Sequence, residues 1–178
     1  TQGGYCPGNV KVYYDSTGGR TNCGDGKYND QTAATSSTEC KDITAGCYGA
    51  SATTACPDVC DDNEYSDAGA SECTACPTDY KNTGDTADKH DGSASCIITV
   101  TAGKYIGTAG DNTTNWDTCA AGTYRGKHQV KYGSTSSCSV CGDNEYSDEG
   151  FGACTACPTD YKNTGNTANK HDGSASCI

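Results

Sequence analysis

The sequence predicts a small disulfide-rich fold: an elongated array of about nine cysteine-rich units, mainly irregular, with short β-hairpins and little or no helix. Three observations predict it. The 178 residues include 15 cysteines. They include no leucine or methionine, and only one phenylalanine and one tryptophan. A segment of the chain also occurs twice with its cysteines in the same register.

The scarcity of large aliphatic side chains shifts the source of stability to the cysteines. Burial of apolar surface contributes roughly 25 cal/mol per Å², whereas ordering one residue costs about 1 to 2 kcal/mol of backbone entropy. In the loop-closure model, one disulfide that closes a loop of about 12 to 20 residues contributes about 3 kcal/mol. We therefore expect the disulfides to matter more than the apolar core.

The charge and the cysteine content together predict an extracellular or cell-surface protein. The net charge is -11 and the pI is about 4.4, which argues against binding to nucleic acid phosphates. No apolar run approaches the length of a membrane-spanning helix, and TQGGYCPG lacks the pattern of a secretion signal. The sequence is thus expected to be a processed or partial chain.

The repeated segment runs from Cys60 to Ile97 and again from Cys141 to Ile178. Of its 38 positions, seven differ and 31 are identical. Each copy has the spacing C-x12-C-x2-C-x19-C. The repeat predicts four segments: irregular cysteine-rich units over 1–59, the first copy over 60–97, variable intervening units over 98–140, and the second copy over 141–178.

A tyrosine follows most of the cysteine boundaries, and we expect these tyrosines to be structural. Because tyrosine is almost the only large side chain, it must fill the interiors of the units and pack against neighbouring units. The nine tyrosines in this slot are Tyr5, Tyr28, Tyr48, Tyr65, Tyr80, Tyr105, Tyr124, Tyr146 and Tyr161.

The simplest disulfide pattern closes each unit on itself. It pairs Cys23 with Cys40, Cys47 with Cys56, Cys60 with Cys73, Cys76 with Cys96, Cys119 with Cys138, Cys141 with Cys154, and Cys157 with Cys177. Cys6 is left over, which indicates a bond between chains or a partner in a missing segment. A link from Cys6 to Cys47, with Cys56 unpaired, is an open alternative because spacing alone does not determine connectivity.

Two stretches carry a resemblance to known families. The CPTDYKNTG start at Cys76, the YSDAGASECTAC stretch at Tyr65 and the C-x2-C boundaries resemble the ephrin-receptor-like cysteine-rich repeats of eukaryotic surface proteins. The Ala-, Thr- and Ser-rich composition, with recurring C-x19-C, is more particularly similar to ciliate surface coat proteins of the immobilisation-antigen type. This resemblance implies an extracellular, disulfide-bonded, non-catalytic coat protein, often lipid-anchored, although no apolar C-terminal tail is present here.

Metal binding is a weaker interpretation of the same cysteines and of the acidic run near them. The spacing C-x2-C-x12-C-x2-C at Cys138, Cys141, Cys154 and Cys157 suits four-thiolate zinc. Zinc there leaves Cys177 without a partner, and the upstream counterpart has the spacing C-x3-C. The acidic run DDNEYSD lacks the glycine that a calcium loop requires at its sixth position. We therefore expect no metal and no cofactor.

The remaining candidate residues point to surface features rather than to an active site. His90 and His171 lie in identical KHDG contexts, which we interpret as exposed turns, and His128 stands alone. With no nucleophile in a matching constellation, an enzyme is not expected. Trp116 is interpreted as a local packing element. Asn112 begins NTT, the only N-x-S/T acceptor in the chain, and predicts N-glycosylation.

These features predict a non-enzymatic structural protein of a cell-surface coat or fibre, assembling head to tail from disulfide-stapled repeats. Its partner is then itself, as a homopolymer or within a longer tandem chain, with covalent glycans and no nucleic acid. A membrane contact would need an anchor that this sequence lacks. The alternative is a receptor-like extracellular module that binds a protein or carbohydrate through the variable loops of residues 98–137.

Overall fold

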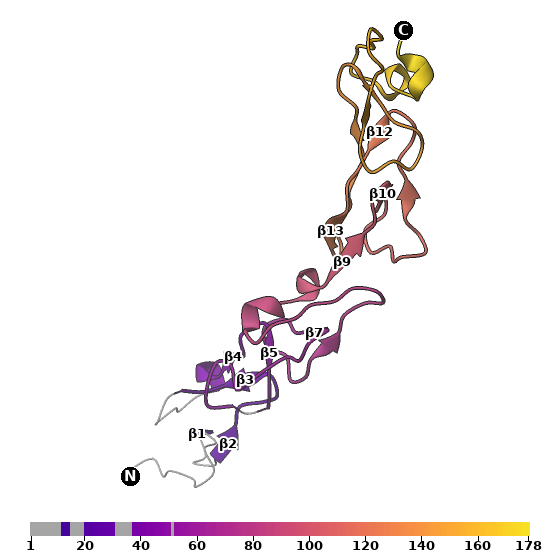
Figure 1. The fold of residues 1–178 in the computed structure, drawn as a ribbon. Coiled ribbons are helices and arrows are strands. Elements are labelled where there is room, and N and C mark those ends of the chain that lie inside the picture. Colours follow the sequence, from indigo (N-terminus) through magenta and orange to yellow (C-terminus); the bar gives the residue numbers. More distant parts are fainter. Residues whose placement is uncertain (1–11, 15–19, 31–36, 51) are drawn as a thin grey trace. The chain divides into compact units, whose positions relative to one another are not determined.

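The computed structural model describes residues 12–14, 20–30, 37–50 and 52–178, so the predictions for Tyr5 and Cys6 lie outside the described residues. The chain divides into two compact units, Thr1–Cys96 and Ile97–Ile178. The four segments that the repeat predicts therefore combine in pairs, with one copy of the repeat at the C-terminal side of each unit. Figure 1 shows the elements of both units in chain order.

Short antiparallel strand pairs make up the regular structure. The first unit contains β1 (Val12–Tyr14), β2 (Arg20–Asn22), β3 (Lys27–Tyr28), β4 (Lys41–Asp42), β5 (Cys47–Tyr48), β6 (Asp58–Val59), β7 (Glu64–Tyr65) and β8 (Thr74–Ala75). Consecutive strands pair as β1–β2, β3–β4, β5–β6 and β7–β8. Three 3₁₀ helices accompany them, η1 (Ser37–Glu39), η2 (Ala87–Lys89) and η3 (Ser93–Ser95).

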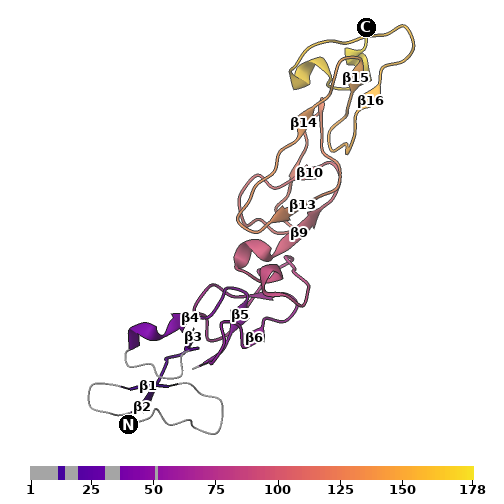
Figure 2. The same ribbon diagram turned by 90° about the vertical axis from the view of Figure 1, so that its left-hand side faces the viewer.

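The second unit has the same kind of elements and one crossing connection. It contains β9 (Ile97–Val100), β10 (Lys104–Tyr105), β11 (Asp117–Thr118), β12 (Thr123–Tyr124), β13 (His128–Lys131), β14 (Ser139–Val140), β15 (Glu145–Tyr146), β16 (Thr155–Ala156), η4 (Ala168–Lys170) and η5 (Ser174–Ser176). The pairs are β9–β13, β10–β11, β12–β14 and β15–β16; the last lies beside the C-terminus in Figure 2. The described residues contain no α-helix, so the predicted fold class is confirmed.

Both units follow one sequence frame of four turns. Each turn starts at an anchor residue, followed three positions later by a residue in the left-handed conformation. The anchors are Cys23, Ile43, Cys60 and Cys76 in the first unit, and Val100, Cys119, Cys141 and Cys157 in the second. Six of these eight anchors are at most 3% exposed. The buried core is therefore largely this series of anchors rather than a cluster of large side chains.

The left-handed residues let successive turns approach closely. They are Gly26, Gly46, Asn63, Asp79, Gly103, Gly122, Asn144 and Asp160. Their φ angles lie between 63° and 81°, a region that glycine, asparagine and aspartate tolerate best. At Gly103, for example, the N–H donates to the Arg125 carbonyl at 2.8 Å and the carbonyl accepts the Cys119 N–H at 2.9 Å. The same pair of bonds is made at five other left-handed residues: Gly26, Gly46, Asn63, Gly122 and Asn144.

The disulfides follow the same frame. The bonded pairs are Cys23–Cys40, Cys47–Cys56, Cys60–Cys73, Cys76–Cys96, Cys119–Cys138, Cys141–Cys154 and Cys157–Cys177, the pairs that the spacing predicts. Six of the seven begin at an anchor cysteine. In C-x2-C, the first cysteine bonds to the preceding anchor and the second is the next anchor, with a two-residue strand between them at Thr74–Ala75 and Thr155–Ala156.

The two anchors that are not cysteines show what replaces a disulfide. Ile43 and Val100 are both fully buried. Because Ile43 cannot bond to Cys56, that cysteine pairs instead with Cys47 on β5. Trp116, three positions before the next anchor, stands where Cys40 stands in the first unit. In the sequence frame, an apolar anchor and an indole thus occupy the two positions of a disulfide.

The tyrosines fall into two groups. Six of them follow the left-handed residue by two positions, end a two-residue strand and are half-buried: Tyr28, Tyr48, Tyr65, Tyr105, Tyr124 and Tyr146. Tyr80 and Tyr161 instead follow it directly, after Asp79 and Asp160, and lie outside the strands. The slot that the sequence predicts as equivalent for all these tyrosines is therefore two different positions, because the turn after CPT is one residue shorter.

Candidate functional site

The densest group of polar side chains lies inside the repeated segment, around a buried histidine. The His90 side chain is fully buried. Its Nδ1 lies 2.8 Å from the Glu64 carbonyl oxygen and its Nε2 lies 2.7 Å from the Gly84 carbonyl oxygen. Asn82 donates from Nδ2 to the same Glu64 oxygen at 2.7 Å and to Ser95 Oγ at 3.0 Å. We call these residues the histidine clasp.

The second copy builds the same clasp. His171 is fully buried, with Nδ1 at 2.8 Å from the Glu145 carbonyl and Nε2 at 2.9 Å from the Gly165 carbonyl. Asn163 donates to the Glu145 carbonyl and to Ser176 Oγ. The prediction that KHDG is an exposed turn is therefore wrong. The imidazole rings are buried with both ring nitrogens within hydrogen-bonding distance of backbone carbonyl oxygens.

The differences between the copies lie outside the clasp. Every clasp residue is unchanged, whereas the seven positions that differ are exposed in the first copy except for half-buried Ala70: Asp61, Ala68, Ala70, Ser71, Glu72, Asp85 and Asp88. At one of them, Asp88 becomes Asn169, whose Oδ1 accepts a hydrogen bond from Thr167 at 2.6 Å. The repeat therefore retains its shape while its surface charge changes.

Two exposed groups, Asp88 and Lys41, have pKa values shifted by neighbouring side chains. A hydrogen bond from the Thr86 hydroxyl lowers the pKa of the exposed Asp88 carboxyl, and a hydrogen bond from Lys89 lowers it further. A hydrogen bond from Lys41 to Asp30, together with the charge of that carboxylate, raises the pKa of Lys41. Both groups are exposed, so these pairs contribute little to stability.

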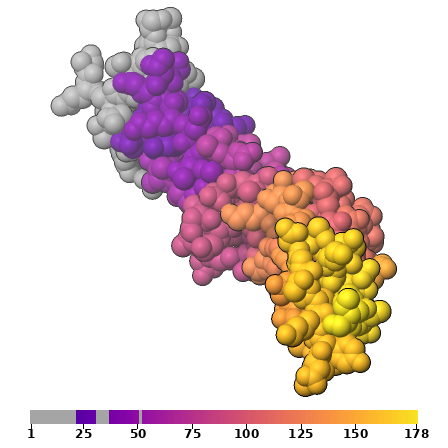
Figure 3. Space-filling view, turned by 90° about the horizontal axis from the view of Figure 1, so that it is seen from above, coloured from indigo at the N-terminus to yellow at the C-terminus, as the bar shows by residue number. Residues whose placement is uncertain are grey.

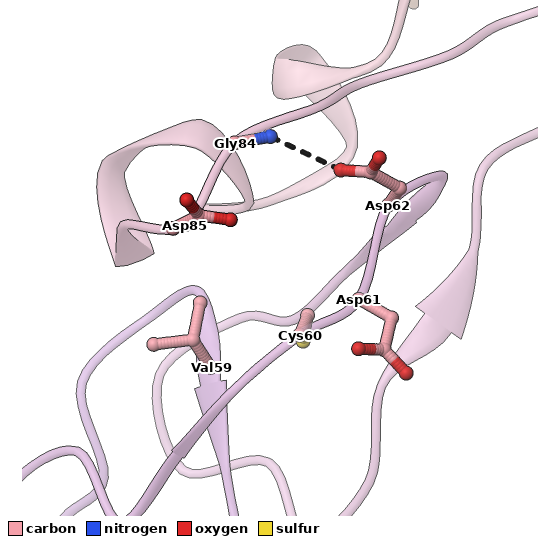
Figure 4. Close-up of a pocket in the computed structure, with 6 residues that line it drawn as sticks. All are labelled: Val59, Cys60, Asp61, Asp62, Gly84 and Asp85. Atoms are coloured by element: carbon pink, nitrogen blue, oxygen red, sulfur yellow. Dashed lines mark hydrogen bonds between the residues drawn. The ribbon is translucent and has the colours of Figure 1, made fainter.

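A hollow of about 590 Å³ lies in the first unit, between β6 and the residues before η2. It is lined by Val59, Cys60, Asp61, Asp62, Gly84 and Asp85. Figure 4 shows that Asp62 is bound to the loop, because its carboxylate accepts the Gly84 N–H at 3.1 Å. The carboxylates of Asp61 and Asp85 do not point to a common centre. The second copy has glycine and asparagine at these two positions, so the acidic lining is not a shared feature.

His128 has a neighbour that the sequence does not reveal. Its Nε2 lies 3.0 Å from Ser136 Oγ and its Nδ1 lies 2.9 Å from the Gly126 carbonyl. The serine hydroxyl also accepts the Ile106 N–H at 3.0 Å, and the Ser136 N–H donates to the Ile106 carbonyl. Ser136 thus links the β13 segment to the end of β10, which is a structural use of a serine–histidine pair.

The four cysteines with zinc-like spacing are all in disulfides, which leaves no thiolate among them to bind a metal. Among the described residues, no group of three or more histidine, cysteine, aspartate or glutamate side chains is placed to hold a metal ion. Within the same ranges, no helix has the length and apolarity needed to cross a membrane.

The predicted N-glycosylation residue, Asn112, lies half-buried in the loop between β10 and β11.

Comparisons with protein-family models and with curated protein sequences find no match to this chain. Its class is therefore defined by the fold: a small protein of disulfide-stapled cysteine-rich repeats. The seven disulfides among the described residues indicate folding in an oxidising compartment, as for secreted and extracellular proteins.

Proposed function

We propose that this chain is a non-enzymatic structural protein of an extracellular surface coat or fibre, similar to the ephrin-receptor-like repeats and to the ciliate immobilisation-antigen type. Its polar side chains support this function because the buried ones serve the frame. His90, His171 and Asn82 bind backbone carbonyls, and six anchors are disulfide-bonded. Covalent crosslinks distributed along both units give such a chain resistance to unfolding and proteolysis.

The observation that carries the assembly proposal is a difference between identical sequences. Tyr80 is 3% exposed, whereas Tyr161 is 55% exposed. The residues around them, 73–84 and 154–165, are identical in sequence. The local sequence therefore does not explain the difference in exposure. Ile178 is 89% exposed beside Lys162, to which it is joined by two backbone hydrogen bonds. The end of the chain lies at the surface of its unit in Figure 3.

We infer that another copy of the chain covers this face head to tail. Burying two such side chains contributes about 3 to 5 kcal/mol, whereas association costs about 4 kcal/mol or more in lost freedom. The contact is therefore weak between free chains and becomes strong only when copies are linked or repeated, because linkage raises the effective concentration to the millimolar range. This suits a coat built from many identical units.

The proposal predicts weak, reversible self-association at the highest protein concentrations, because the gain from burial only just offsets the cost of association. Light scattering across a concentration series should show a rising average mass, and Tyr161→Ser should abolish the rise. Phe151→Ser is the matched control, since Phe151 is a comparably exposed aromatic at 42%. A native protein that stays monomeric over the series, or equal loss in both variants, contradicts the proposal.

A further inference from the structure

The loop between β10 and β11 contains the one N-x-S/T sequence of the chain, Asn112–Thr113–Thr114. This loop belongs to the turn that starts at Val100, the turn in which Trp116 replaces a half-cystine. The corresponding first-unit loop ends at Cys40, which is bonded to Cys23. The loop that carries the sequence motif therefore has no disulfide at its end.

The asparagine side chain is held by its own motif. Asn112 Oδ1 accepts two hydrogen bonds from Thr114, one from the backbone N–H at 3.1 Å and one from Oγ1 at 2.7 Å. The Asn115 N–H closes the turn on the Asn112 carbonyl at 3.1 Å. Asparagine turns of this type orient the side chain over its own backbone. The amide oxygen is thus occupied by donors from within the motif.

The amide nitrogen of Asn112 remains available. In the described structure, Nδ2 makes no hydrogen bond, while Thr113, Thr114 and Asn115 are all exposed. Hydrogen bonds donated to Oδ1 polarise the amide and make the Nδ2 protons more acidic, which favours loss of one of them as a new bond forms. The free atom is therefore the one that glycosylation uses.

We propose that Asn112 is an N-glycosylation site whose donor is a lipid pyrophosphate-linked oligosaccharide. The bond that forms joins Asn112 Nδ2 to C1 of the first sugar, and the bond that breaks joins C1 to the pyrophosphate oxygen. The lipid pyrophosphate is the leaving group, and one Nδ2 proton passes to a base of the transferase. The proposal rests on the proposed function only in requiring passage through a secretory pathway.

Expression behind a secretion signal in a eukaryotic host, with mass analysis before and after peptide N-glycosidase, tests the site. We expect one N-glycan per chain, at Asn112. Asn112→Gln and Thr114→Ala should remove it completely, whereas Thr114→Ser, which keeps the hydroxyl donor, should retain it. Asn115→Gln, three residues away in the same loop, is the control and should leave the glycan in place.

Analysis of both the secreted and the cell-retained protein keeps the result independent of folding, because the transferase acts in the secretory lumen. Chains without a glycan in both pools overturn the inference. The self-association of the Asn112→Gln chain is a separate readout, since Tyr161 lies in another loop. Glycosylated protein that never self-associates overturns the proposed function and leaves the modification site supported. Protein that self-associates but carries no glycan overturns the modification site and leaves the proposed function supported.

Discussion

Alanine at Gly103 is expected to lower the free energy of unfolding by about 4 kcal/mol. A Cβ atom there would lie 1.7 Å from the Gly150 carbonyl oxygen, at a φ of +77°. The left-handed backbone costs about 1 to 2 kcal/mol for alanine, and a forced displacement of packed backbone costs about 1 to 3 kcal/mol more. Denaturant unfolding of the disulfide-bonded protein measures the change.

Gly133→Ala is the matched control, because Gly133 has the same φ of +77° with no atom within 4 Å of the added Cβ. It should cost only the backbone share, about 1 kcal/mol. The difference between the two variants therefore measures how closely the turns are packed. Equal losses at Gly103 and Gly133 contradict the close approach of the turn to the loop at Gly150.

Removal of a clasp histidine is the second large effect. His90→Ala should cost about 3 kcal/mol, because it removes the ring contacts with the Glu64 and Gly84 carbonyls and opens a cavity. His171→Ala should cost about the same, since its contacts are nearly identical. Unfolding by denaturant at one pH compares them.

His128→Ala is the internal control for the clasp. Its ring is only half-buried and its partners are the Gly126 carbonyl and the Ser136 hydroxyl, which water can replace. We expect a loss below about 1 kcal/mol, as for surface positions in general. If His90→Ala were as mild as His128→Ala, the clasp would not be a structural element.

The fold class followed from composition and spacing because cysteines are numerous, regularly spaced and chemically distinct. A two-residue strand separates the two cysteines of each C-x2-C. The first cysteine bonds to an earlier cysteine in the chain and the second bonds to a later one. The larger four-turn frame was harder to recognise from the sequence. Ile43, Val100 and Trp116 interrupt the cysteine pattern at three places, so the first two turns of each unit no longer resemble each other in sequence.

The burial of His90 could not be predicted from the local pattern. KHDG has the composition of a solvated turn, and its burial depends on carbonyls at Glu64 and Gly84, 26 and 6 residues away. The difference in exposure between Tyr80 and Tyr161 could not be predicted from the local sequence, because the neighbouring residues are identical in the two copies. Asn112 is the converse case: its motif is readable in the sequence, and the structure adds the hydrogen bonds that leave Nδ2 free.

Disulfide mapping by mass spectrometry of non-reduced peptides tests the repeating frame most directly. The native chain should yield the seven pairs described above, including the shifted Cys47–Cys56 bond. In the variant Val100→Cys with Trp116→Cys, an eighth bond should form between the two new cysteines, since they occupy the anchor position and its partner. Native pairs other than these seven, or two free thiols in the variant, would contradict the frame.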